Sequence, residues 1–103
     1  MTNFVACDTI NTVGTSFQGT VKTTYDNLVE VFGEPTAMDA SPYEKVNAQW
    51  SVEAKDENNT VFTIYNWKDG YVPTEEYDWH IGGFDFNAYC VATDILNKLE
   101  EVV

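Results

Sequence analysis

The chain contains no arginine, so lysine is its only strongly basic residue. Five lysines stand against 17 aspartates and glutamates, which gives a formal net charge of −12 at pH 7. Nucleic-acid phosphates need positive partners, so this composition argues against direct binding of DNA or RNA. Without arginine, the chain also lacks the side chain that clamps a phosphate or carboxylate with two parallel hydrogen bonds. The charge instead favours partners with basic surfaces, including nucleic-acid-binding grooves on other proteins.

Cysteine and long apolar runs are also scarce. Cys7 and Cys90 are the only two cysteines and lie far apart, so they predict neither a disulfide framework nor a zinc site. No apolar segment approaches the length of a membrane span, and no signal peptide is apparent. We therefore expect a soluble protein of a reducing cytoplasm with no membrane contact, in which Cys90 is a buried free thiol.

What the chain does contain is enough apolar sequence for a core. Its 103 residues are 44% apolar and 15% aromatic, which is typical of one folded domain despite the high charge. We see no domain boundary and predict a single domain over residues 1–103. Residues 1–16 are weakly patterned and are expected to form an N-terminal arm or an extra strand.

A short helix is predicted directly after Thr23, which we expect to cap it with Asp26 as the capping-box acid. Gly33 and Pro35 mark its end, because glycine suits the left-handed position after a helix and proline blocks its continuation. Four apolar residues lie on one face at helical spacing: Tyr25, Leu28, Val29 and Phe32.

Strand patterns surround this helix. They cover Phe17–Thr24, Lys45–Lys55, Thr60–Trp67 and Tyr77–Ile81, with a hairpin turn at Asp56–Asn59. In the second of these, alternation places five residues on one side: Val46, Ala48, Trp50, Val52 and Ala54. The third strand is apolar on both faces, which suggests a central position in the sheet.

The last segment predicts a second helix after the Gly82-Gly83 break, with Asp85 as its N-cap. Its apolar stripe comprises Ala88, Ala92, Ile95, Leu99 and Val102. The whole pattern predicts an α+β fold in the order β-α-β-β-β-α. We expect an antiparallel sheet of about four strands with the two helices packed on one face.

The only histidine, His80, lies two residues from Asp78, so both side chains point the same way from a strand. An Asp–His pair can act in general base catalysis, but none of the serines or threonines lies in a nucleophile motif. No His-x-x-x-His or comparable spacing predicts a metal site. We therefore expect a non-enzymatic protein with no cofactor and no metal, and we keep an Asp78–His80 enzyme as the less favoured alternative.

Carboxylates cluster around two predicted turns and could imitate the charge pattern of a nucleic-acid duplex, with a solvated acidic face as the simpler interpretation. The candidate protein-binding residues are Glu53, Asp56, Glu57, Asp69, Glu75, Glu76 and Asp78. Aromatic residues in the strands suggest a second possibility, the stacking of a small ligand such as a nucleobase. Its candidate residues are Tyr65, Trp67, Lys68 and His80.

Three segments, "TYDNLVEVFGEP", "TIYNWK" and "WHIGG", occur in an order that resembles a family of small acidic proteins of tailed bacteriophages. The resemblance runs over residues 19–99 and carries no catalytic residues with it. It implies a phage accessory protein in the host cytoplasm that binds and inhibits a host or anti-phage defence protein, as anti-CRISPR proteins do. The expected mechanism is mimicry of DNA, by which acids occupy a basic nucleic-acid-binding surface. The alternative is a protein that binds or sequesters a nucleotide signal. Exposed sheet edges also leave a homodimer open.

Overall fold

The computed structural model describes the backbone of residues 3–39 and 41–101, and all side chains in these ranges except those of residues 9, 10 and 99–101. The strands are β1 (Phe4–Ala6), β2 (Ser16–Thr23), β3 (Ala37–Met38), β4 (Ala48–Ala54), β5 (Val61–Tyr65) and β6 (Tyr77–Gly83). The helices are the 3-10 helix η1 (Thr9–Thr12) and the α-helices α1 (Tyr25–Phe32) and α2 (Asn87–Glu101). The predicted α+β class is confirmed, with an antiparallel sheet and two α-helices.

The sheet has six strands rather than the predicted four, in the order β1-β4-β5-β6-β2 with β3 also paired to β4. The additional strands are β1, in the segment predicted to be an arm or an extra strand, and β3, which was not predicted. They pair with opposite ends of β4, at Val52–Ala54 and at Ala48–Gln49. They have three and two residues, which is too short for side-chain alternation to reveal them in the sequence. The N-terminal segment therefore contributes an extra strand, one of its two predicted roles.

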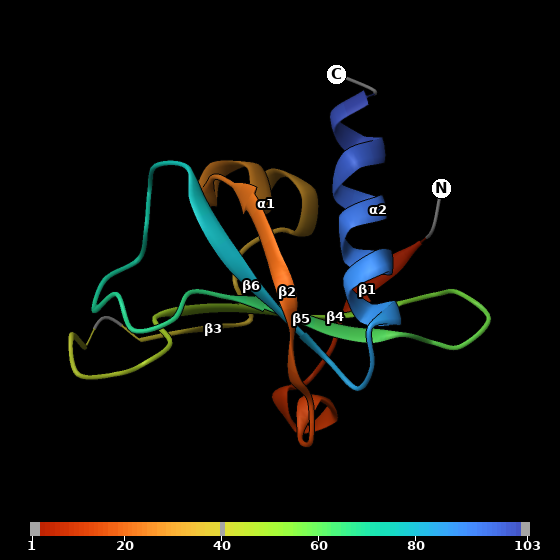
Figure 1. Cartoon of the computed structure of the whole chain (residues 1–103), viewed down its shortest axis with the longest axis horizontal. Coiled ribbons are helices and arrows are strands. Elements are labelled where there is room, and N and C mark those ends of the chain that lie inside the picture. Colours follow the sequence, from red (N-terminus) through yellow and green to blue (C-terminus); the bar gives the residue numbers. More distant parts are fainter. Residues whose placement is uncertain (1–2, 40, 102–103) are drawn as a thin grey trace.

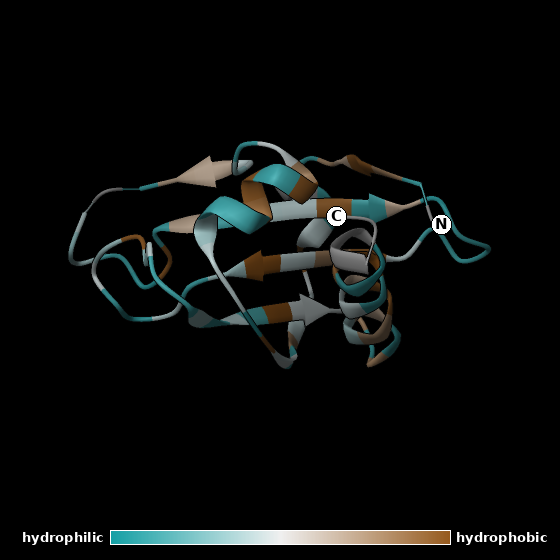
Figure 2. Cartoon of the chain, turned by 90° about the horizontal axis from the view of Figure 1, so that it is seen from above, coloured by the Kyte–Doolittle hydropathy of each residue, from teal (hydrophilic) through white to brown (hydrophobic). Residues whose placement is uncertain are grey.

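Both α-helices lie on one side of the sheet and η1 lies on the other (Figure 1). The core between the sheet and the α-helices is aromatic at its centre. The Trp50 and Trp79 rings meet edge to face at 5.4 Å between centroids, and Phe62 meets Phe32 of α1 at 5.8 Å. Seen from the helix side, apolar strand residues lie beneath the two helices (Figure 2). We call the other side, which neither α-helix covers, the open face.

The connection from β1 to β2 crosses this open face. These two strands form opposite edges of the sheet, so the chain between them must pass over β4, β5 and β6. The backbone N–H of Cys7 donates to the carbonyl of Ser51 in β4 as the crossing starts, at 3.0 Å. The crossing segment, residues 7–15, contains η1 and covers only part of the open face. It thereby forms one wall of a depression there.

Several local predictions need correction. The cap of α1 is Thr24, whose hydroxyl accepts a hydrogen bond from the Asn27 N–H, while the predicted cap Thr23 ends β2. Val46 precedes β4 and lies on the open face instead of in the core, because the strand pairing starts only at Ala48. Cys90 is exposed rather than buried, because it lies on the side of α2 that faces away from Ala88 and Ala92.

The predicted N-cap Asp85 accepts a hydrogen bond from the backbone N–H of Asn87, the first residue of α2, at 3.0 Å. The inner stripe of this helix includes Ala88, Ala92 and Ile95 as predicted. Leu99 and Val102 lie outside the described side chains. Among the described residues, no helix combines the length and apolar character needed to cross a bilayer.

Candidate functional site

A pocket of about 600 Å³ lies on the open face, within the size range of small-molecule sites, about 300–1,000 Å³. It is lined by Thr12, Thr15, Ser16, Phe17, Val46, Gln49, Thr63, Tyr65, Trp67, His80 and Gly82. Aromatic rings and hydroxyl groups dominate this lining, and it contains no carboxylate. The pocket therefore differs in chemistry from the acidic surface around it.

The floor of the pocket follows from strand register. Gln49, Tyr65 and His80 are directly opposite one another on β4, β5 and β6, and side chains opposite one another share a face. One step along, Thr63 is opposite Gly82. A Cβ atom at Gly82 would lie 2.5 Å from the Thr63 hydroxyl and 3.3 Å from the Tyr65 ring. The glycine thus keeps space open where any other residue would fill it.

Phe17 reaches the pocket because of a register shift in β2. It pairs with Gly82, whereas Gly19 pairs with Ile81, so the pairing slips by one residue between Phe17 and Gly19. With regular alternation, Phe17 would share the helix side of the sheet with Val21. The irregularity turns the Phe17 ring to the open face, where it lies 5.2 Å from the imidazole of His80.

His80 lies between the rings of Phe17 and Tyr65, the second at 5.5 Å between centroids. Its Nδ1 is buried and has no hydrogen-bond partner among the described residues. Burial lowers the pKa of His80 below its usual 6.5, while the charges of Asp69 and Asp78 act in the opposite direction. The lowered pKa favours the neutral imidazole at pH 7.

Trp67 forms the rim of the pocket and is 40% exposed. The ammonium groups of Lys45 and Lys68 each lie 5.8 Å from the centre of its ring. Lys68 has a φ of 59°, a left-handed conformation that is unfavourable for a lysine. A hydrogen bond from its backbone N–H to the Lys45 carbonyl, at 2.7 Å, joins the two segments on either side of the ring.

A buried amide pair fixes this rim. The Asn66 side-chain oxygen accepts hydrogen bonds from the backbone N–H groups of Asn47 and Ala48, at 2.8 and 2.9 Å. Its Nδ2 lies within bonding distance of the Asn47 side-chain oxygen, the Tyr71 carbonyl and the Asp69 carboxylate, at 3.1–3.2 Å. Asn47 in turn donates to the carbonyls of two residues in the preceding loop. Because both amides are fully buried, this network holds the segments that carry Lys45 and Trp67 together.

Tyr77 supports the same rim from the core side. Its hydroxyl oxygen accepts a hydrogen bond from the Trp67 backbone N–H at 3.2 Å. Burial, together with a hydrogen bond to the Asp69 carboxylate, raises the pKa of Tyr77 to about 12. The phenol is therefore neutral across the physiological range and can bridge Trp67 and Asp69.

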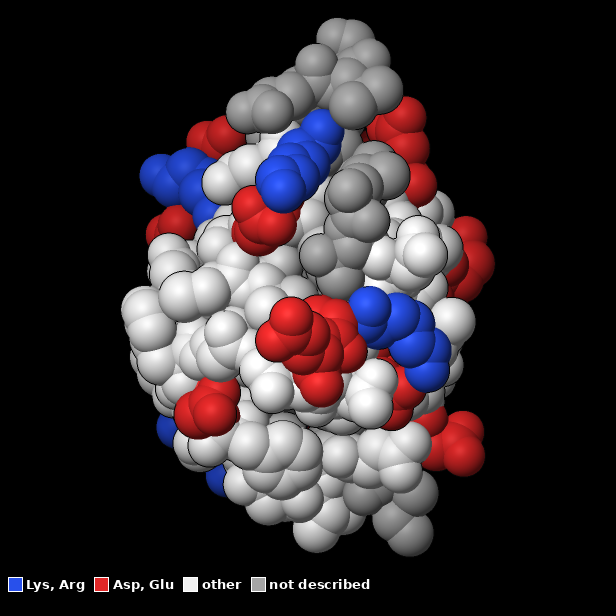
Figure 3. All heavy atoms as spheres, turned by 90° about the vertical axis from the view of Figure 1, so that its right-hand side faces the viewer, with Lys and Arg blue, Asp and Glu red and all other residues white. Residues whose placement is uncertain are grey.

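The predicted acidic residues do not meet in one place. Asp56 and Glu57 lie in the β4–β5 turn, and Glu53 precedes them on β4. Asp69, Glu75 and Glu76 lie in the β5–β6 loop, at the opposite end of the sheet, and Asp78 follows on β6 (Figure 1). Figure 3 faces the β4–β5 turn and shows carboxylates in small groups separated by uncharged residues, several of them beside a lysine.

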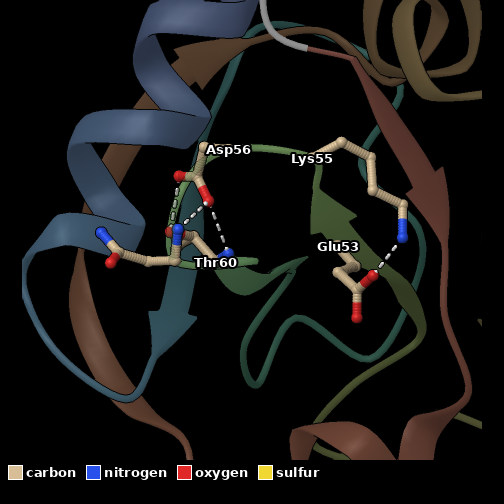
Figure 4. A network of polar contacts seen from close by, with 5 residues as sticks. Glu53, Lys55, Asp56 and Thr60 are labelled. Atoms are coloured by element: carbon tan, nitrogen blue, oxygen red, sulfur yellow. Dashed lines mark hydrogen bonds and ion pairs between the residues drawn. The ribbon is translucent and has the colours of Figure 1, made fainter.

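Three of these acids have structural partners: Asp69 bonds the Asn66 amide and Tyr77, and the other two are drawn in Figure 4. Glu53 forms an ion pair with Lys55. Asp56 accepts hydrogen bonds from the Thr60 hydroxyl at 2.7 Å and from the backbone N–H groups of Thr60 and Asn58. The Thr60 hydroxyl makes the largest contribution to lowering the pKa of Asp56. Asp56 thus organises the turn, whereas Glu57, Glu75, Glu76 and Asp78 remain exposed.

The four candidate ligand residues do come together. Tyr65, Trp67 and His80 line the pocket, and the Lys68 ammonium lies beside Trp67. The other lining residues were not predicted from the sequence, and the largest polar or aromatic ones among them are Phe17 and Gln49. Nδ1 of His80 has no hydrogen-bond partner among the described residues, so this nitrogen is not bonded to Asp78. Within the described part of the chain, no three histidine, cysteine or acidic side chains are placed to hold a metal ion.

Comparison of the chain with protein-family models, with curated proteins and with solved structures gave no match. The phage family that the sequence resembles therefore stays a prediction.

Proposed function

We propose that this protein binds a small planar ligand in the pocket on the open face. The observation that carries the proposal is a pocket of about 600 Å³ in which four rings, those of Phe17, Tyr65, Trp67 and His80, surround a floor kept open by Gly82. Planar ligands stack on such rings, and a few polar groups then fix their orientation. The amide of Gln49 and the hydroxyl of Thr63 are such groups.

The exposed apolar side chains of the pocket support the same proposal. Phe17, on β2, is 56% exposed, and Trp67, which follows β5, is 40% exposed. A planar ligand would cover this apolar surface, which contributes about 25 cal/mol per Å² removed from water. Two energetically unfavourable features also lie at this site: the left-handed backbone of Lys68, and the buried Nδ1 of His80, which has no hydrogen-bond partner among the described residues. Such features concentrate at functional sites.

Thermal-shift measurements with a panel of nucleosides, nucleotides, flavins and indoles test the proposal. At a concentration of about 100 times Kd, a bound ligand is expected to raise Tm by about 10 °C. Trp67→Ala should abolish this shift, because it removes the rim of the pocket, whereas Trp67→Phe should retain part of it. Tyr43→Ala is the matched control, since Tyr43 is 93% exposed and does not line the pocket. An absence of any shift across the panel, or a shift that survives Trp67→Ala, would contradict the proposal.

We also propose, as a second candidate, the inhibitory acidic surface expected from the sequence. It is favoured by Glu75, Glu76 and Asp78, which are exposed, lie within four residues of one another and have no ion pair to any described residue. Exposed carboxylates that have no ion pair can occupy a basic nucleic-acid-binding groove of a host or defence protein. The acids of the β4–β5 turn lie too far away to belong to the same patch, so we restrict this surface to the β5–β6 end.

Charge reversal tests the acidic surface. Glu75→Lys/Glu76→Lys is expected to weaken binding to a captured partner by about 10-fold or more, and higher salt should weaken binding by the unmodified chain. Glu57→Lys is the control at the distant turn and should change the affinity little. Binding that is equally strong at low and high salt would count against this mechanism.

A further inference from the structure

The distribution of lysines identifies the ligand class. Of the five lysines, Lys55 and Lys98 are ion-paired with Glu53 and Asp94. Lys22 forms no ion pair among the described residues either, but it lies on β2 opposite Asp78 rather than beside Trp67. The other two, Lys45 and Lys68, both stand at Trp67 and have no ion pair among the described residues. In a chain of net charge −12, two unpaired cations at one rim form a local exception to the acidic surface.

We infer that the pocket takes a nucleotide, with the base among the rings and the phosphate at Lys45 and Lys68. This inference rests on the proposed ligand-binding function and specifies its ligand. The base needs planar, apolar contacts, which Phe17, Tyr65 and Trp67 supply. The phosphate needs positive charge at one end of the stack, and the two ammonium groups lie 5.8 Å from the ring on which the base would pack. Lysine binds a phosphate as a point charge, so the missing arginine does not prevent this contact.

Backbone and amide hydrogen bonds fix the two segments that carry Lys45 and Lys68. The Lys68 N–H bonds the Lys45 carbonyl, and the buried Asn47–Asn66 pair locks the segments on both sides. The nearby carboxylate of Asp69 is engaged by the Asn66 amide and by Tyr77.

The rings alone would also suit a ligand cation, because aromatic cages bind quaternary ammonium groups. The two lysines decide against this alternative. Their ammonium groups already occupy positions near the Trp67 ring, and a third cation there would be repelled. Hydroxyl and amide groups from Thr63 and Gln49 also match the hydrogen-bonding edge of a base better than a methylated ammonium, which has no donor to offer.

Tryptophan fluorescence gives a direct readout of binding. Trp50 and Trp79 are 2% and 0% exposed, so quenching by a ligand in the pocket reports on Trp67. We expect AMP or GMP to bind at least about 10-fold more tightly than the matching nucleoside, since a charged hydrogen bond contributes roughly that factor. Lys45→Gln/Lys68→Gln should reduce the nucleotide affinity to that of the nucleoside, while Lys98→Gln, on α2, should leave it unchanged.

The outcomes separate this inference from the proposal on which it rests. If nucleoside and nucleotide bind the unmodified protein equally well, or if the double lysine variant keeps full nucleotide affinity, the phosphate contact is wrong although a planar ligand still binds. Binding of choline or of an aromatic carboxylate in preference to nucleotides would overturn the ligand class in the same way. If no planar compound binds at all, the proposed function itself fails.

Discussion

Replacement of Asn66 by alanine is expected to lower the free energy of unfolding by about 3–5 kcal/mol. The substitution removes the oxygen that accepts from two buried backbone N–H groups, those of Asn47 and Ala48. Each buried donor left without a partner costs about 1–3 kcal/mol, and the Asn47 side-chain oxygen also loses its donor. Urea unfolding monitored by tryptophan fluorescence measures the change.

Asn97→Ala is the matched control for this substitution. Asn97 is exposed on α2, so the same change in side chain should alter the unfolding free energy by less than about 0.5 kcal/mol. If Asn66→Ala is as mild as Asn97→Ala, the amide network does not hold the rim of the pocket together. The same result would weaken the role given to Lys45 and Lys68, because their placement depends on that network.

Gly83→Ala is the second substitution with a large expected effect, about 3 kcal/mol or more of destabilisation. A Cβ atom at position 83 would lie 2.1 Å from the Cβ of Ala88 and 3.6 Å from its Cα. Neither atom can rotate away, since one belongs to β6 and the other to the first turn of α2. The methyl group can enter only if the helix moves off the sheet, which separates the Ala88 and Ala92 stripe from the core.

A double-mutant cycle isolates this contact. Ala88→Gly alone should cost about 1–2 kcal/mol, from lower helix propensity and a lost buried methyl group. In the background of Ala88→Gly, the change Gly83→Ala should cost much less than it does alone, because the obstructing atom is gone. Strictly additive effects in chemical denaturation would show that the close approach of β6 and α2 is not what requires glycine at position 83.

The elements in which apolar residues recur at regular spacing were predicted from the sequence. Alternation in residues 45–55 correctly separated Trp50 and Val52 in the core from the residues on the other face. Alternation in Tyr77–Ile81 likewise placed His80 on the face opposite Trp79 and Ile81, where the pocket lies. The error at Val46 arose because alternation continues past the point where pairing begins, and only the partner strand defines that point.

The complete pocket could not be predicted, because its parts meet through long-range pairing. Tyr65 faces His80 across a loop whose length does not fix the register of the strands it joins. Phe17 arrives from β2 through a one-residue slip in pairing, and a slip of one residue reverses the face of every side chain beyond it. Asn47 and Asn66 carry no local sign of a shared network, although two buried asparagines at strand ends are a signal that could have been pursued.

The crossing of the open face has a consequence for the order in which the molecule assembles. Strands β4, β5 and β6 follow one another as antiparallel neighbours and need only short closures, whereas Thr20 of β2 pairs with His80, 60 positions later. The entropy of closing that long loop favours β2 docking after the other three strands. The contact of Phe17 with His80 is then formed late, so the pocket exists only in the finished chain. A ligand that binds in the pocket would stabilise only the state in which β2 has docked, and so would favour this last step of folding.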